Sequence, residues 1–234
     1  MSLSLEEMRV RLKALRARIE AACVECSRSL KSVKIIWVSK FQSKEAVETA
    51  ILLGAQEFGE NRVQEAVEKF GTPRAGIRVH IIGPVQSNKL RKAASVADVI
   101  QTVADKETLV KLEAVCAELN KKIDVMFQIN TSEEDTKSGI AMNEVSAFFE
   151  DLPETPHLCF RGLMTIGKNT GNPEDSRAGF AFLRRTRAAL QKRGGVFTDC
   201  TELSMGMTDD LEVAIEEGAT MIRVGTALFG SRGY

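Results

Sequence analysis

The chain has 234 residues, 44% of them hydrophobic and 27% charged, which is enough to bury the core of one sizeable domain. Its 32 basic and 32 acidic residues balance, so no overall charge favours nucleic acid or an anionic membrane as a partner. No apolar run approaches the roughly 20 residues of a membrane helix, and the N-terminal residues lack the pattern of a secretory signal. We therefore expect one cytoplasmic, monomeric domain over residues 1–234 that binds neither nucleic acid nor membrane.

Five cysteines are scattered through segments with ordinary helix and strand patterns, and an odd number cannot all pair within one chain. We therefore expect reduced thiols. Cys23 and Cys26 have the spacing of a redox pair or of half a zinc site. However, the apolar residues of segment 5–26 recur every three or four positions, which predicts an amphipathic helix. A core-facing position is favoured over a redox role, since no second cysteine pair completes a metal site.

After this first helix, short β-branched runs alternate with helical stretches. Eight such runs begin near Ile35, Gln56, Arg78, Asp98, Ile123, Leu158, Asp199 and Met221. Helices are predicted over residues 43–54, 61–70, 105–120, 174–193 and 208–218, with Gly54, Gly71, Gly194 and Gly218 as helix stops. This alternation predicts a parallel sheet. Eight runs in a chain of this size favour a closed (β/α)8 TIM barrel, with the extra N-terminal helix outside it, over an open doubly wound sheet.

Lys40 ends the first of these runs, residues 35–39, and a helix-like segment follows it. A lysine at the C-terminal tip of a barrel strand points its amine to the face where such folds carry out chemistry, so it can form a Schiff base with a carbonyl. Most lysines at strand ends are instead solvated, protonated and poor nucleophiles. On spacing alone, a solvated lysine is the favoured interpretation.

Two polar residues stand on the next two strands. Asn61, after the second strand, can cap the following helix or hydrogen-bond a ligand, and the two roles can coexist. His80 lies within the apolar third strand. A buried histidine is more often a hydrogen-bonded core residue than a catalyst, but a pocket shared with Lys40 would favour a chemical role.

Two turns near the C-terminus, residues 204–208 and 223–226, are rich in small and hydroxyl side chains and precede predicted helical segments. Backbone N–H groups at a helix start favour an anion, and phosphate commonly binds after strands seven and eight of a barrel. Alternatively, Gly206 and Gly225 only shape tight turns. An amine on strand one and a phosphate site after strands seven and eight would suit an aldehyde that carries a phosphate. Pyridoxal 5′-phosphate (PLP) has both groups.

Seven stretches then match one known family in order along the chain. They are residues 38–40, 58–61, 80–89, 130–132 with 137–139, 162–167, 204–207 and 222–230. With them the chain resembles, over nearly all its length, the pyridoxal phosphate homeostasis proteins, which are PLP-binding relatives of the N-terminal barrel of alanine racemase. The resemblance implies a fold-type III barrel with PLP as its cofactor.

The resemblance also implies roles for individual residues. Lys40 would form the internal aldimine, Asn61 and His80 would line the cofactor, and Arg223 would lie against the pyridine nitrogen. The phosphate-binding turns would contribute the remaining cofactor-binding residues, namely Ser204, Met205, Gly225 and Thr226. The chain departs from the usual family pattern at a few positions near the rim, among them Thr208, where serine is common.

Two functions fit a PLP-binding barrel. The first, which the resemblance implies, is vitamin B6 homeostasis: the protein holds PLP as a reversible aldimine, buffers it and delivers it to PLP-dependent apo-enzymes. The alternative is an amino-acid racemase of fold type III with weak activity. Racemisation needs a base on each face of the substrate, and Lys40 supplies one, whereas the racemase draws its second base, a tyrosine, from another domain. The only tyrosine here is Tyr234.

An arginine at the ring nitrogen keeps its own proton, which makes the ring a weak electron sink. The lack of a second base and the weak electron sink both favour a non-catalytic binding protein. His80 or Lys137 remains a candidate second base for trace racemase or transaminase activity. A third interpretation is a sugar-phosphate aldolase or isomerase in which Lys40 attacks a substrate carbonyl. It is less favoured, because the carboxylates at the strand ends, Glu60 and Asp209, both fit helix starts.

Overall fold

The computed structural model describes residues 3–72, 74–132 and 138–230. Eight parallel strands form a barrel: β1 (Lys34–Val38), β2 (Glu57–Glu60), β3 (Arg78–Ile81), β4 (Val99–Val103), β5 (Ile123–Asn130), β7 (Leu158–Met164), β8 (Glu202–Ser204) and β9 (Met221–Val224). Neighbours pair in the order β4-β3-β2-β1-β9-β8-β7-β5, and the pairing of β4 with β5 closes the ring. The predicted TIM barrel is therefore confirmed. The short β6 (Ile140–Ala141) extends the sheet beyond β5.

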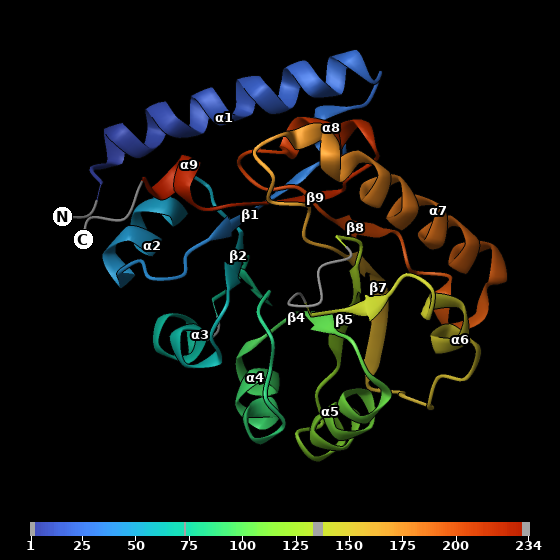
Figure 1. Ribbon diagram of the computed structural model, residues 1–234. Coiled ribbons are helices and arrows are strands. Elements are labelled where there is room, and N and C mark those ends of the chain that lie inside the picture. The colour runs from blue at the N-terminus through green and yellow to red at the C-terminus, as the bar shows by residue number, and fades with distance from the viewer. Residues whose placement is uncertain (1–2, 73, 133–137, 231–234) are drawn as a thin grey trace.

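Helices surround the strands on the outside (Figure 1). The α-helices are α1 (Leu5–Glu25), α2 (Lys44–Leu52), α3 (Val63–Phe70), α4 (Leu90–Val96), α5 (Lys106–Glu118), α6 (Val145–Glu150), α7 (Arg177–Arg193), α8 (Leu211–Glu216) and α9 (Thr226–Phe229). Short 3-10 segments are η1 (Leu30–Ser32), η2 (Ser87–Lys89), η3 (Pro173–Ser176) and η4 (Gly195–Phe197). Within the described residues, no helix is long and apolar enough to cross a membrane.

The N-terminal helix α1 lies outside the barrel against α8 and α9, as predicted (Figure 1). It begins with a capping box, in which the Ser4 hydroxyl accepts from the Glu7 N–H and the Glu7 carboxylate accepts from the Ser4 N–H. Its apolar stripe is buried, and Cys23 on that stripe is only 1% exposed. The core-facing prediction is thus confirmed for Cys23, while Cys26 is half-buried at the helix end. All five cysteines are free thiols.

Alternation of side chains along each strand separates two apolar regions. Inward-facing residues form a small cluster of Ile36, Val99, Met126 and Met221 inside the barrel. Outward-facing residues pack under the helices and make up most of the core. The densest aromatic packing lies around Phe127 on β5, whose ring centroid is 4.9 Å from that of Phe149 on α6 and 5.0 Å from that of Phe160 on β7.

We predict that Phe127→Ala lowers the free energy of unfolding by about 3–5 kcal/mol, because it removes a fully buried ring and leaves a cavity. Val110→Ala on the exposed face of α5, where Val110 is 54% exposed, is the matched control and should change stability by less than about 0.5 kcal/mol. Urea unfolding of both variants measures the difference. Equal losses would contradict the central place of this aromatic cluster in the core.

Candidate functional site

A cavity of about 320 Å³ lies at the C-terminal ends of the barrel strands. This is where barrel folds place their functional residues, and the volume suits a small cofactor. The lining residues come from the ends of the strands or from the loops that follow them. They are Val38, Lys40, Asn61, Ile82, Ile166, Met207, Thr208, Asp209, Arg223, Gly225 and Thr226.

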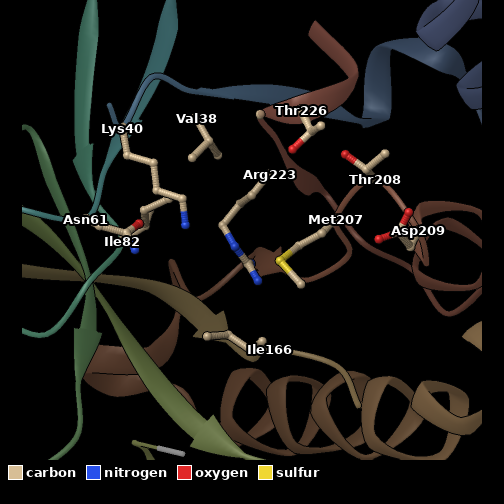
Figure 2. Close-up of a pocket in the computed structure, with 11 residues that line it drawn as sticks. Val38, Lys40, Asn61, Ile82, Ile166, Met207, Thr208, Asp209, Arg223 and Thr226 are labelled. Carbon is tan, nitrogen blue, oxygen red and sulfur yellow. The ribbon is translucent and has the colours of Figure 1, made fainter. Parts of the chain in front are cut away.

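Lys40 stands in the loop directly after β1, and its amine points into the cavity between Asn61 and Arg223 (Figure 2). Thr208 and Thr226 lie on the other side of Arg223 (Figure 2). The cavity therefore places an amine at one side and two hydroxyls at the other, which is the arrangement expected from the sequence.

The backbone before Lys40 is fixed by buried polar groups. The Ser39 carbonyl accepts a hydrogen bond from Lys69 Nζ at 2.7 Å, and the Ser39 hydroxyl donates to Glu60 Oε1 at 2.7 Å. Lys69, in the last turn of α3, also pairs with Glu60 at 2.9 Å. The side chains of Lys69 and Glu60 are 7% and 0% exposed, so this ion pair is shielded from water.

The backbone after Lys40 is held by the same helix. Phe41 has a φ of 64°, which a residue with a bulky side chain rarely adopts. Its N–H donates to Glu65 Oε2 at 2.8 Å, and Glu65 in turn pairs with Lys69 at 3.1 Å. Burial raises the pKa of Glu65, but the Phe41 N–H and the Lys69 ammonium outweigh it and leave the pKa lowered. We refer to Glu60, Glu65 and Lys69 as the α3 clamp.

Glu60 is the last residue of β2, not a helix-start residue as the sequence suggested. Its pKa is raised by burial, against the opposing effect of Ser39 and Lys69. Because Glu60 bonds Ser39 and Lys69 and does not line the cavity, it is poorly placed to serve a substrate as acid or base. This removes one of the two carboxylates on which an aldolase interpretation depended.

Asn61 faces the cavity rather than capping α3. The N-cap of α3 is Arg62, which makes no side-chain cap bond. The Asn61 backbone is held by close contact with the next strand end, since a Cβ on Gly83 would lie 2.3 Å from the Asn61 carbonyl oxygen. Of the two roles that the sequence left open, the geometry favours ligand contact.

His80 does not line this cavity. Ile82, directly after β3, does line the cavity. Residues two apart along a strand face the same side, so His80 on β3 lies one layer below Ile82, deeper in the barrel. His80 is 1% exposed, with Nε2 2.6 Å from Glu57 Oε2 and Nδ1 2.8 Å from Gln101 Nε2. His80 is thus a buried histidine with both ring nitrogens hydrogen-bonded. Because it does not reach the cavity, it cannot act as a second base there.

Ser204 and Met205 are also placed deeper than expected, and both are 0% exposed. Ser204 ends β8 inside the barrel, whereas Met205 packs in the outer core. The chain then turns at Gly206, which has a φ of 92° and lies so close to α8 that a Cβ would meet Ala214 Cβ at 2.5 Å. Only after this turn does the loop reach the cavity.

Met207, Thr208 and Asp209 are therefore the residues of this loop that line the cavity. The sequence placed Met207 and Thr208 in a candidate phosphate turn without assigning either a cofactor contact, and it interpreted Asp209 as a helix-start residue. The Asp210 carboxylate supports the loop by accepting from the Met207 N–H at 2.6 Å. Asp209 lies beside Thr208, on the side of the cavity away from Lys40 (Figure 2). The sequence feature that could have indicated this part of the site is the hydroxyl of Thr208, which follows the Gly206 turn.

Arg223, Gly225 and Thr226, which the resemblance assigned to the cofactor site, line the cavity from the end of β9. Arg223 donates from Nη2 to the Thr165 carbonyl at 2.7 Å and from Nη1 to Ser204 Oγ at 2.8 Å. Burial lowers the pKa of Arg223 to about 10, partly opposed by Asp210, so the guanidinium stays charged at neutral pH. Lys137, the other candidate second base, lies outside the described residues, as does the single tyrosine of the sequence, Tyr234.

Comparisons with known proteins agree with this geometry. Residues 10–233 match the family model of the alanine racemase N-terminal domain. A pyridoxal phosphate homeostasis protein of Haemophilus influenzae is 38% identical, with 95% of each chain covered, and one of Escherichia coli K12 is 36% identical, with 95% of this chain and 96% of the relative covered. The chain therefore belongs to the alanine racemase N-terminal domain family. Within it, the chain belongs to the pyridoxal phosphate homeostasis proteins.

Solved structures of similar proteins agree with this family assignment and with the barrel fold. PipY of Synechococcus elongatus with PLP bound is 34% identical, with a TM-score of 0.82 and coverage of 95% of this chain and 100% of PipY. Alanine racemase of Clostridium difficile has a TM-score of 0.69 at 17% identity, and the match covers 98% of this chain but 57% of the racemase. The racemase likeness concerns the barrel fold alone.

We predict that Lys69→Met lowers the free energy of unfolding by about 3 kcal/mol or more, because it leaves two carboxylates without their cation in a shielded site. Lys111→Met is the matched control, since Lys111 is also paired with a glutamate at i,i+4 but is 44% exposed, and it should change little. Urea unfolding compares them. Adding Glu60→Gln to Lys69→Met should restore part of the loss. A loss no larger than that of the control would contradict a stabilising α3 clamp.

Proposed function

We propose that this protein binds PLP as a Schiff base with Lys40 and takes part in intracellular vitamin B6 homeostasis. The observation that carries the proposal is the placement of the Lys40 amine and the Thr208 and Thr226 hydroxyls around one cavity of about 320 Å³. The PLP-bound structure of PipY and the names of the curated relatives support it.

The lining residues fit the chemical groups of PLP. The cofactor supplies an aldehyde that condenses reversibly with an amine. Thr208, Gly225 and Thr226 would bind the phosphate through hydroxyls and backbone N–H groups. Asn61 and Arg223 would contact the ring, with Arg223 donating to the pyridine nitrogen. In this assignment Thr208 takes the place first given to Ser204 and Met205.

We further propose that the protein holds PLP without efficient turnover. Arg223 stays charged at neutral pH, so it donates a hydrogen bond and leaves the ring nitrogen without a proton of its own. Such a ring withdraws electrons weakly, which disfavours carbanion chemistry. The carboxylate of Asp209 lies away from Lys40, and His80 is outside the cavity. Weak amino-acid racemase activity is the alternative, and its rate with L-alanine is the direct check.

A homeostasis role also requires that PLP can leave. Met207, which lines the cavity, is 40% exposed, and Phe41 beside Lys40 is 52% exposed, so the mouth lies at the surface. A Schiff base at such a mouth is open to competing amines. We infer that the protein buffers PLP in the cytoplasm and hands it to apo-enzymes, acting as a monomer.

The first test is the visible absorption spectrum of the purified protein saturated with PLP. We expect a lysine-aldimine band that is absent in Lys40→Ala and retained in Lys44→Ala, which removes an exposed lysine at the start of α2. Borohydride reduction and peptide mass mapping should place the adduct on Lys40. An adduct on another lysine, or no band in the wild-type protein, would refute the proposal.

The phosphate assignment has its own test. We expect the double variant Thr208→Val with Thr226→Val to bind PLP about tenfold or more weakly, because each lost hydroxyl removes a hydrogen bond to a charged group. Its affinity for pyridoxal, which lacks the phosphate, should stay unchanged. Fluorescence titration with both ligands measures the ratio. Equal weakening for PLP and pyridoxal would place the phosphate elsewhere.

A further inference from the structure

Five polar side chains form a continuous hydrogen-bonded chain through the inside of the barrel. Arg223 Nη1 lies 2.8 Å from Ser204 Oγ, and Ser204 Oγ lies 2.6 Å from Gln101 Oε1. Gln101 Nε2 lies 2.8 Å from His80 Nδ1, and His80 Nε2 lies 2.6 Å from Glu57 Oε2. Glu57 is the first residue of β2, so this series of hydrogen bonds connects the cavity to the opposite end of the barrel. We refer to these residues as the interior chain.

Every link in the interior chain has a defined direction. Arginine can only donate, so Ser204 Oγ accepts from Arg223 and sends its own hydrogen to Gln101 Oε1. The Gln101 amide nitrogen then faces His80 Nδ1, which must accept. The imidazole proton is left on Nε2 and is donated to Glu57. Reversing the Gln101 amide would place two donors on Ser204 Oγ and leave its hydrogen without this acceptor.

The interior chain is buried along most of its length. Arg223, Ser204, Gln101 and His80 are each 5% exposed or less. Burial raises the pKa of Glu57, but the His80 hydrogen bond and the nearby Arg78 and Lys34 charges outweigh it and leave the pKa lowered. An ionised carboxylate thus anchors one end of the chain and a guanidinium forms the other. Hydrogen bonds between groups as buried as Arg223, Ser204, Gln101 and His80 are strong and geometrically restrictive.

We propose that Glu57, His80, Gln101 and Ser204 are positioning residues that hold the guanidinium of Arg223 in the orientation needed to contact the PLP ring. The inference rests on the proposed function. Arginine has many rotamers, and fixing one before the ligand arrives reduces the entropy lost on binding. The Thr165 carbonyl holds Nη2, and the interior chain holds Nη1, so the two nitrogens are restrained from different strands. His80 and Ser204 therefore act on the cavity without lining it.

The test removes hydrogen bonds of the interior chain at two buried side chains, Gln101 and Ser204. Gln101→Met keeps the side-chain length, and Ser204→Ala removes one oxygen. We expect each to weaken the binding of both PLP and pyridoxal by about three- to tenfold, the effect of one lost hydrogen bond. The matched control is Met126→Leu, a volume-conserving change in the same barrel interior, which should bind both ligands like the wild type. A Ser204 that instead contacted phosphate directly would weaken PLP binding alone, which would overturn the proposal.

Three further variants separate positioning from general stability. Combining Gln101→Met with Ser204→Ala should weaken binding no more than Ser204→Ala alone, because losing the Ser204 hydroxyl already disconnects Arg223 from Gln101. Additive losses would overturn the proposal. Glu57→Gln keeps an acceptor for His80 and should retain the wild-type affinity, whereas Glu57→Ala should weaken binding. Equal affinities for these two Glu57 variants would count against a role for the far end of the chain.

The direction of the interior chain can be measured without PLP. Nitrogen-15 NMR of the unloaded protein should show the His80 proton on Nε2, with the second histidine, His157, assigned through His157→Gln. A proton on Nδ1 would overturn the directed chain. A wild-type protein that binds no PLP would overturn the proposed function and this inference together. Normal wild-type binding, with Gln101→Met and Ser204→Ala matching the Met126→Leu control, would overturn this inference alone.

Discussion

The pairing of β1 with β9 is the interaction on which the site depends. The two strands are the first and last of the barrel, and their parallel register aligns Ile36 with Arg223 and Trp37 with Val224. Lys40 therefore leaves β1 beside the end of β9, where Arg223, Gly225 and Thr226 line the same cavity. Because β4 also pairs with β5, the ring cannot open at another seam without losing strand hydrogen bonds. Groups from opposite ends of the sequence are thus held at fixed positions around one cavity.

Much of the fold could be predicted from the sequence, because the barrel strands are short β-branched runs with helical stretches between them. The predicted runs begin within three residues of the observed strands, as at Asp199 against the observed start of β8 at Glu202. The short helix α6 and the two-residue β6 were not predicted, since so few residues give no clear periodicity. The helix after β8 begins later than expected, at Leu211, because a turn held by Asp210 comes first.

The sequence predicted which strands carry the residues of the candidate site, but not how deep in the barrel each side chain lies. Lys40, Asn61 and Arg223 lie in the cavity as expected, although their roles toward PLP stay predictions. A sequence shows which strand a residue belongs to, but one step of two residues along that strand moves a side chain from the cavity to the barrel interior. This is why His80 lies below Ile82. Ser204 ends β8, and the chain must pass the Gly206 turn before Thr208 reaches the cavity. The buried Gln101 and the half-buried Glu57 carry no local motif, and only the contacts between strands show that they are partners of His80.

The α3 clamp has a consequence for how a ligand enters and leaves. Both peptide groups that flank Lys40 are anchored to α3 by side chains of the protein itself, and these anchors do not involve the cavity. The backbone conformation that presents the amine, including the strained Phe41, is therefore already formed before any ligand arrives. In the proposed Schiff base, exchange of one carbonyl compound for another would therefore require no rearrangement of the backbone around Lys40. The rate of that exchange would be set by bond-making and bond-breaking at the Lys40 amine, so a competing small amine in solution would govern how long the bound aldehyde is retained.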